Sequence, residues 1–287
     1  MEFKRFWKLY RKNRAAVIGL ILTIFFLVMG IFAPFIAPQD PNTGKLTERL
    51  SPPFWMEGGS RRHLFGTDSL GRDILSRVIY GSRISILIGV VVVSVATITG
   101  VMIGLVSGYF GGKVDAIIQR IVDTLLAFPY LIFALAIMSV LGPGLKNIIL
   151  ALVYKEWVTP CRVIRGDTLV AKEENYVEAA QAMGASNWHI LIRSLLPNVM
   201  ASVIVVASLR IGWVVLMEAS LSFLGLGVQP PTATWGGMVA GGRDYIFQAW
   251  WITAFPGIAI FLLVMGVNLM GEGLRDAFDP KLTRGKK

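Results

Sequence analysis

Long apolar runs, separated by shorter polar segments, make up most of the chain. They occupy residues 15–37, 84–107, 116–141, 148–164, 199–226 and 250–270. The hydrocarbon layer of a bilayer is about 30 Å thick, so a spanning helix needs about 20 mainly apolar residues and satisfies its backbone amides within the segment. The pattern therefore predicts an all-α, polytopic membrane protein with about six transmembrane helices.

Polar segments show where the chain leaves the membrane. The longest, 38–82, combines scattered charges with prolines that exclude a membrane helix: Pro38, Pro41, Pro52 and Pro53. Glycines within 108–112 and a Gly-Pro-Gly sequence at 142–144 predict two tight turns. The run at 148–164 is the weakest of the six, since polar residues and a proline interrupt it: Lys155, Glu156, Thr159 and Pro160.

Basic residues gather at both ends of the chain. Lys4, Arg5, Lys8, Arg11, Lys12 and Arg14 precede the first run, and Arg275, Lys281, Arg284, Lys286 and Lys287 follow the last. The positive-inside rule places both ends in the cytoplasm. We expect a cytoplasmic basic N-terminus at 1–14, a first span at 15–37, an external polar segment at 38–82, a membrane domain of five spans at 83–272 and a cytoplasmic tail at 273–287. Trp250 and Trp251 then fall at the outer interface, where indoles collect.

The composition supports a membrane protein and excludes other classes. Hydrophobic residues are 54% and charged residues 16% of the chain, and the mean hydropathy is +0.63, unlike a soluble domain. The net charge of +10 lies largely beside the spans, which argues against nucleic acid as a partner. The single cysteine, Cys161, excludes an internal disulfide, and with only His63 and His189 as histidines we expect no metal site. The first run is too long for a cleaved signal and is expected to remain as an anchor.

The polar segment at 165–197 carries an amphipathic pattern. Its apolar and small residues recur every three or four positions: Val177, Ala180, Gly184, Trp188, Leu191 and Leu195. Glycine is unfavourable inside a helix, and Ser186 or Asn187 suits a helix N-cap. We therefore predict a helix, a turn at Gly184 and a second short helix that stops before Pro197, on the cytoplasmic side.

These residues carry a resemblance to a known family. Glu178-Ala179-Ala180, Gly184 after three further residues, Trp188 on the same amphipathic pattern, and Leu196-Pro197 resemble the E-A-A loop of ABC importer permeases, whose helices dock in a groove of the ATPase subunit. Two longer stretches, 65–73 (FGTDSLGRD) with 81–85 (GSRIS) and 218–227 (EASLSFLGLG) with 235–236 (WG), resemble the C-type permeases (DppC/OppC-like) of dipeptide, oligopeptide, nickel-chelate or glutathione importers. The resemblance implies a type I permease fold for 83–272.

The resemblance also implies partners. It implies a second (DppB/OppB-like) permease subunit, two ATPase subunits that bind ATP and Mg, an external substrate-binding protein, and a place in the bacterial inner membrane. A P-loop requires G-x-x-x-x-G-K-[ST], and the nearest sequence fails, because Ser107 replaces the first glycine and Val114 follows Gly112-Lys113. We therefore expect a transport subunit that is not itself an enzyme, holds no cofactor and moves peptides by alternating access.

Two charged residues in the fifth run are candidates for the translocation path. A charge at mid-bilayer costs about 2.5–3.5 kcal/mol on insertion scales, so Arg210 and Glu218 are expected to face protein or a water-filled path. Eight residues apart, they lie about 12 Å apart along a helix and need not pair. Either a neighbouring helix satisfies each charge, or the two line the passage of a zwitterionic peptide.

Several other features have both a structural and a functional interpretation. Small residues at every fourth position, Ala96, Gly100, Gly104, Gly108 and Gly112, predict close helix packing, either within this chain or against a second permease. Pro129 and Pro256-Gly257 predict bends that are either fixed or hinges. We expect His63 to be solvated rather than a nickel ligand, His189 to lie on a helix surface, and Cys161 to fill a small apolar space.

Two rival functions predict other features. A transporter driven by an ion gradient often carries chains of membrane carboxylates, yet Glu218 is the one acid that falls deep in a clear apolar run. A membrane-embedded enzyme needs a nucleophile with a base, or a metal cluster, within the bilayer. The sequence shows no such grouping of residues in its apolar runs.

Overall fold

The computed structural model describes residues 3–278, which form helices and irregular segments without a β-strand. The α-helices are α1 (Phe3–Tyr10), α2 (Arg14–Ile31), α3 (Ala33–Ile36), α4 (Ile74–Phe110), α5 (Gly112–Ala127), α6 (Tyr130–Leu141), α7 (Leu145–Glu156), α8 (Val158–Ala171), α9 (Asn175–Ala182), α10 (Asn187–His189), α11 (Leu196–Phe223), α12 (Trp235–Gly242) and α13 (Trp251–Phe278). Short 3₁₀ turns η1 (Leu46–Glu48) and η3 (Arg243–Tyr245) and a π-helical turn η2 (Ile190–Leu195) complete the order. The predicted basic tail beyond Phe278 lies outside the described residues.

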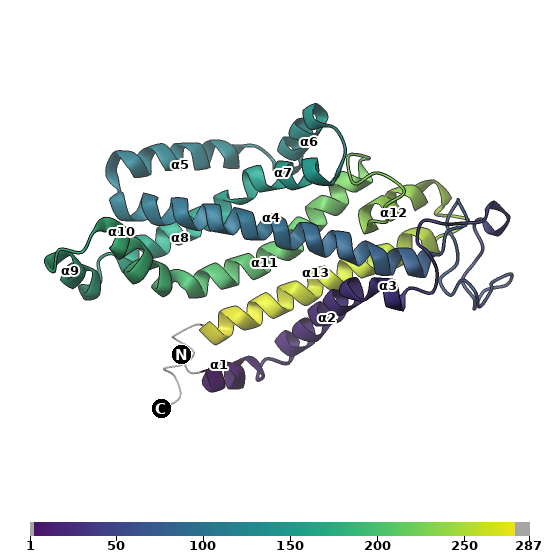
Figure 1. Cartoon of the computed structure of the whole chain (residues 1–287), viewed down its shortest axis with the longest axis horizontal. Coiled ribbons are helices and arrows are strands. Elements are labelled where there is room, and N and C mark those ends of the chain that lie inside the picture. Colours follow the sequence, from purple (N-terminus) through teal and green to yellow (C-terminus); the bar gives the residue numbers. More distant parts are fainter. Residues whose placement is uncertain (1–2, 279–287) are drawn as a thin grey trace.

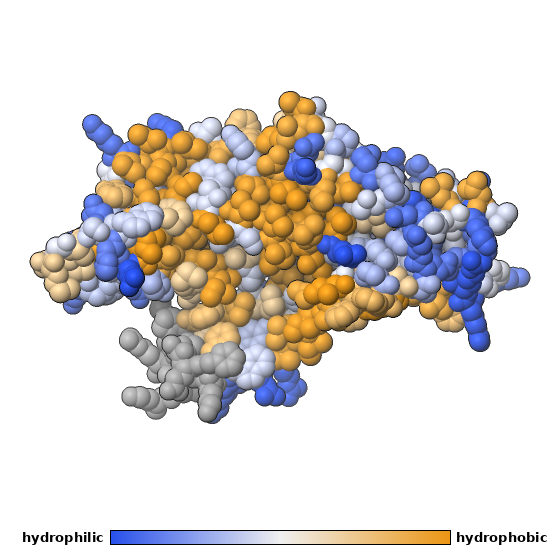
Figure 2. Space-filling view, in the orientation of Figure 1, coloured by the Kyte–Doolittle hydropathy of each residue, from blue (hydrophilic) through white to orange (hydrophobic). Residues whose placement is uncertain are grey.

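Long helices form the body of the molecule. Figure 1 shows α2, α4, α11 and α13 running along its long axis, with α2 beside α13 and α4 beside α11. Apolar residues cover the middle of this body, and hydrophilic residues cover the end at the right, which holds the segment after α3 (Figure 2). This distribution suits a bundle that crosses a bilayer and exposes polar segments at its ends.

The described residues contain fewer membrane-length helices than the six runs predict. Four helices are long and apolar enough to cross, namely α2, α4, the continuous helix Asn187–Phe223 and α13, and a fifth crossing results if α5 and α6 act as one. Those two helices meet at an angle of 89°. Phe128 precedes Pro129 and is held in extended conformation (φ −85°, ψ 134°), because a residue before proline disfavours the helical region.

The weak run at 148–164 is two helices rather than one. α7 ends at Glu156 and α8 begins at Val158, so the predicted fourth span is divided at Trp157. Lys155 and Glu156 are buried at this junction, where the Lys155 Nζ donates to the Phe128 carbonyl and Glu156 pairs with α11. The two charges interrupt the apolar run because they join helices inside the protein.

The glycine stripe on α4 packs against α8 within this chain. A Cβ on Gly104 would lie 2.6 Å from the Cys161 carbonyl oxygen, and one on Gly108 would lie 2.7 Å from the Thr168 Cβ. A Cβ on Gly100 would lie just as close to the Trp157 carbonyl oxygen and the Pro160 side chain. The interpretation of the stripe as packing within one subunit is confirmed at these three glycines, and the predicted role of Cys161 as a buried filler agrees with its zero exposure.

At the polar end of the bundle the structure refines one expectation and corrects another. Within the predicted polar segment 38–82, α4 already begins at Ile74, where the Asp73 carboxylate accepts a hydrogen bond from the Ser76 amide at 2.8 Å. Trp251 is 3% exposed instead of lying at a lipid interface, since its Nε1 donates to the Thr67 carbonyl beneath the folded segment. Only its neighbour Trp250 is exposed, at 40%.

Candidate functional sites

The predicted amphipathic loop forms the end of the molecule opposite the polar segment. α9 and α10 lie at the left in Figure 1, beyond the ends of α4 and α11. Val177 and Ala180 of α9 point into a cluster with Leu105, Ile164 and other apolar residues, while Glu178 and Ala179 are exposed. Trp188 is 61% exposed on α10. The loop therefore has one face fixed to the bundle and one face free to contact another molecule.

Gly184 shapes the turn of this loop. Its φ is +78°, in the left-handed region that glycine adopts without a steric penalty. The Gly184 amide donates to the Gln181 carbonyl at 2.9 Å, and the Ala185 amide donates to the Ala180 carbonyl at 3.0 Å. This pair of bonds is a Schellman motif, which ends α9 at a defined direction. Ser186 then caps α10 by accepting from the His189 amide at 3.3 Å, as predicted.

The second helix of the loop does not stop before Pro197, which corrects the prediction. The chain stays helical from α10 through η2 into α11, and Leu196 and Pro197 form the first turn of α11. Proline has no N–H to donate to the preceding turn of a helix. It is tolerated here because it lies in the first turn of α11, directly after the wider π-helical turn η2, where this hydrogen bond is not required. The exposed loop is thus continuous with a membrane-length helix, Asn187–Phe223. His189 lies exposed on this surface, as expected.

Arg210, one path candidate, faces a groove. Its guanidinium makes a bidentate ion pair with Glu156, with 2.8 Å between Nη2 and Oε2, and its Cζ lies 5.3 Å from the ring centre of Trp213. The Arg210 side chain keeps 23% of its exposure, whereas Glu156 keeps 1%. Arg210 and Trp213 line an open groove together with Thr159, Leu209, Val264 and Asn268. The arrangement presents a cation and an exposed indole on the face of α11 and α13.

Glu218, the other candidate, is fully buried. One carboxylate oxygen accepts from the Ser222 hydroxyl at 2.7 Å, and the second oxygen has no hydrogen-bond partner among residues 3–278. The Ser85 hydroxyl of α4 is likewise unpaired within the described chain. Arg210 pairs with Glu156 rather than with Glu218, as the spacing along the helix predicts. The burial of Glu218 inside this chain favours a structural role for it.

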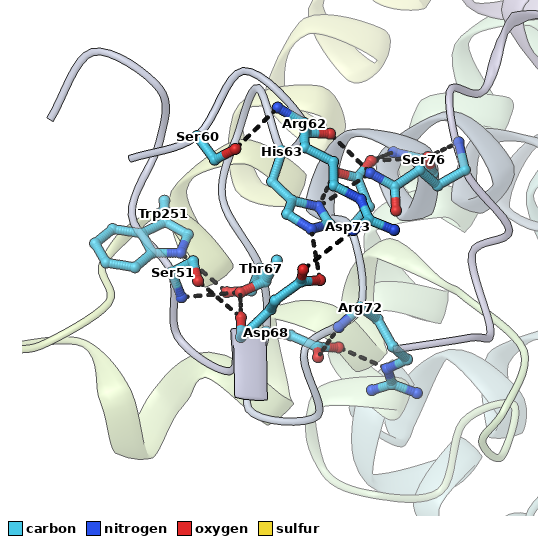
Figure 3. A network of polar contacts seen from close by, with 12 residues as sticks. Ser51, Ser60, Arg62, His63, Thr67, Asp68, Arg72, Asp73, Ser76 and Trp251 are labelled. Atoms are coloured by element: carbon cyan, nitrogen blue, oxygen red, sulfur yellow. Dashed lines mark hydrogen bonds and ion pairs between the residues drawn. The ribbon is translucent and has the colours of Figure 1, made fainter. Parts of the chain in front are cut away.

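The polar segment between α3 and α4 is a folded unit built on buried polar contacts (Figure 3). His63 is 3% exposed, which corrects the expectation that it is solvated. Its Nδ1 lies 3.0 Å from the Asp73 carboxylate and its Nε2 lies 3.3 Å from the Glu48 carboxylate. The hydrogen bond between His63 and Glu48, together with the positive charge of the nearby Arg62, holds the pKa of Glu48 below its ordinary value. No group of three or more His, Cys, Asp or Glu placed to hold a metal occurs within residues 3–278.

The motif at 65–73 supplies most of this unit, and its roles were not recognised from the sequence. Gly66 and Gly71 have φ of +80° and +74° and make the two turns. The Thr67 hydroxyl donates to the Glu48 carbonyl and accepts from the Ser51 amide, and Asp68 accepts from the Arg72 side chain and two backbone amides. A run of Gly, Thr, Asp and Arg at fixed positions is the signal that could have predicted a hydrogen-bonded turn.

The second motif locks α12 onto the long helices. The Trp235 Nε1 donates to the Val78 carbonyl of α4 at 2.8 Å, and the indole is fully buried. Gly81 is required beneath this ring, because a Cβ there would lie 2.7 Å from the Trp235 Cδ1. Gly236 similarly allows α12 to approach α11, since a Cβ on Gly236 would lie 2.6 Å from the Ala219 Cα. Both motifs therefore build the same end of the bundle.

Comparison with known proteins gives matches along the whole chain. Residues 100–284 match the family of binding-protein-dependent transport system inner membrane components, and residues 2–53 match the N-terminal TM domain of oligopeptide transport permease C. The chain is 43% identical over 279 residues to the di/tripeptide transport system permease protein DppC of Pseudomonas aeruginosa (97% of this chain, 92% of the relative). It is 45% identical over 278 residues to the probable D,D-dipeptide transport system permease protein DdpC of Escherichia coli (97% and 91%) and 40% identical over 280 residues to the glutathione transport system permease protein GsiD of Pectobacterium atrosepticum (98% and 91%).

Proposed function

The chain belongs to the family of binding-protein-dependent transport system inner membrane components, and on this premise we propose that it forms half of a peptide pathway powered by separate ATPase subunits. It is a transport permease of the bacterial inner membrane, with the type I ABC importer permease fold. The relatives named for di/tripeptides, D,D-dipeptides and glutathione support a peptide as cargo. Each of these is a short, polar molecule with at least one carboxylate.

The exposed face of the loop at 165–197 is the observation that carries the energy-coupling role. Val177 and Ala180 hold α9 against the bundle, so Glu178, Ala179 and Trp188 form a surface with a fixed orientation. Because the same helix continues from Trp188 into α11, a force on the loop reaches the face that carries Arg210. We infer that an ATPase subunit, which binds ATP and Mg, docks on this surface, and that the second ATPase engages the related permease subunit.

The remaining topology follows from the positions of the two ends of the bundle. An ATPase partner places the loop at 165–197, and with it α1 and the end of α13, in the cytoplasm. The folded polar segment then lies outside, where an external binding protein delivers the peptide. Nucleotide binding draws the docked loop inward and rocks α11, so that a cavity shared with the second permease switches sides. Arg210 borders a groove on α11 and α13, and this open groove supports placing the second permease against that face.

Charge reversal at Glu178 tests this function. The complete assembly, reconstituted in proteoliposomes with its binding protein, is compared with variants Glu178→Lys and Glu272→Lys. Glu272 is an exposed acid on α13 outside the loop and controls for the change of charge. E178K is expected to insert and assemble but to lose peptide uptake and the ATPase activity that the loaded binding protein stimulates, whereas E272K keeps both. Unchanged coupling in E178K, or full transport by this chain without an ATPase, would overturn the proposal.

A further inference from the structure

A second polar site lies at the end of the bundle that holds the folded segment. A partly open pocket of about 250 Å³ lies between the turn at 68–72, the first turn of α4, the chain after α11 and the helix α12. Its polar lining includes Asp68, Ser69, Arg72, Arg77, Gln229 and Thr232. We call it the Arg72–Arg77 pocket. It is distinct from the groove beside Arg210, with which it shares no residue.

The charges in this pocket do not balance. The Arg72 Nε donates to the Asp68 carboxylate at 2.7 Å, and the Arg77 Nε lies 3.7 Å from the same carboxylate. Asp68 is the one acid among the lining residues, so two guanidinium groups share one carboxylate. The side chains of Arg72 and Arg77 keep only 15% and 7% of their exposure. A net positive charge is therefore carried by two largely buried side chains that line a partly open pocket.

Donors for a ligand remain in this space. Arg77 uses its Nη1 to donate to the Pro41 carbonyl at 2.7 Å. The Arg72 side chain donates to Asp68 through its Nε (Figure 3), and its terminal nitrogens make no hydrogen bond among residues 3–278. The first turn of α12, at Thr234 and Gly237, also borders the pocket and adds the positive end of a helix dipole.

We propose that the Arg72–Arg77 pocket binds a single carboxylate group. A partly buried charge is unfavourable unless an opposite charge accompanies it, and the planar fork of arginine matches the two oxygens of a carboxylate. The volume lies below the roughly 300–1,000 Å³ of ordinary ligand pockets, so the site suits one small acidic group rather than a long peptide. The carboxylate comes either from the C-terminus of a short peptide or from an Asp or Glu side chain of the delivering protein. This choice of sources rests on the proposed function.

Gly241 allows a test that leaves the hydrogen-bonded turn intact. Substituting Arg72 would also remove the partner of Asp68 and disturb the segment. Gly241 borders the pocket from α12, and a Cβ there would meet no atom within 4 Å. Gly241→Asp places a carboxylate at the pocket, and Gly241→Asn adds a side chain of the same size without the charge. Equal assembly and equal thermal unfolding of both variants exclude a folding defect.

The assembled complex is titrated with dialanine, with dialanine amide and with the peptide-loaded binding protein. If the peptide terminus is the ligand, dialanine binds to the wild type and to G241N. It binds to G241D about tenfold or more weakly, because the introduced carboxylate occupies the donors. Dialanine amide, which lacks the carboxylate, binds poorly to all three proteins. If a protein side chain is the ligand, only the binding protein loses affinity for G241D relative to G241N. Equal behaviour of G241D and G241N toward every probe would overturn the proposal. The loss of ATPase coupling expected for E178K does not depend on how G241D and G241N differ in binding. An incorrect pocket assignment can therefore be distinguished from an incorrect proposed function.

Discussion

Arg210 of α11 and Glu156 at the end of α7 lie 54 positions apart in the sequence and form a bidentate ion pair that joins the two helices. The two side chains differ in exposure to solvent. The Glu156 side chain is 1% exposed, whereas the Arg210 side chain is 23% exposed and faces the groove on α11. Glu156 therefore depends on Arg210 for its counter-charge. Arg210 has, in addition, a part of its guanidinium available to a partner or a passing peptide.

The pair predicts opposite outcomes for single and double substitution. Arg210→Met leaves the buried Glu156 unpaired and is expected to destabilise the complex by about 3–5 kcal/mol, whereas the double variant Arg210→Met with Glu156→Met is expected to recover most of this loss. Thermal unfolding of the assembled complex measures both. Peptide uptake then separates the two roles of Arg210: uptake lost in a stable double variant indicates contact with the cargo, and uptake regained indicates a structural role. A single variant as stable as wild type would contradict the importance of the pair.

Hydrophobic patterning predicted the long helices but not how their ends fold. α2, α11 and α13 follow the apolar runs because every backbone amide in a membrane must be satisfied within its helix. α4 begins earlier than its run because Asp73 caps it and the folded segment covers its first turn. Proline at position 129 signals a break, but it does not give the 89° angle between α5 and α6. Local sequence does not contain that information.

The candidate site shows the same division between local and distant contacts. The loop, its turn at Gly184 and its cap at Ser186 were predicted, since each arises from residues close together in the chain. His63 was expected in solvent because its partners, Glu48 and Asp73, lie 15 and 10 residues away and meet it only when the segment folds. The continuation of the helix through Pro197 depends on the π-helical turn, for which the sequence carries no clear signal.

The α4–α8 contact predicts a contrast between two glycines. Gly104→Ala forces a methyl group against the Cys161 carbonyl, 2.6 Å away, and is expected to destabilise the chain by about 1–3 kcal/mol. Gly166→Ala on α8 is the control, because a Cβ there meets no atom within 4 Å, and alanine favours a helix by about 1 kcal/mol over glycine. Thermal unfolding of the purified complex should therefore fall for G104A and stay level or rise for G166A. A loss of the same size in both would show that the effect is not due to this contact.

The lowered pKa of Glu48 predicts a pH dependence of the folded segment. Because the hydrogen bond with His63 favours the carboxylate in the folded state, its stabilising effect is complete above the ordinary value of about 4.3 and is lost as pH falls through the lower folded pKa. Hydrogen exchange of residues 46–65 at neutral pH should be faster in Glu48→Gln than in wild type. The difference should disappear at acid pH. Glu57→Gln, at an exposed acid of the same segment, controls for loss of charge, and a difference that persists at acid pH would contradict the prediction.

Gly184 predicts a way to separate the shape of the loop from its contact with an ATPase. A left-handed conformation costs most residues about 1–2 kcal/mol, but asparagine adopts it more readily, so Gly184→Val is expected to reduce ATP-coupled uptake about tenfold while Gly184→Asn stays near wild type. A Cβ at this position meets no atom within 4 Å in the chain itself, so neither variant clashes before assembly. Uptake and stimulated ATPase activity are measured in proteoliposomes with equal amounts of complex. If G184N fails as completely as G184V, the turn conformation is not the requirement, and glycine is needed instead to leave room for the docked partner.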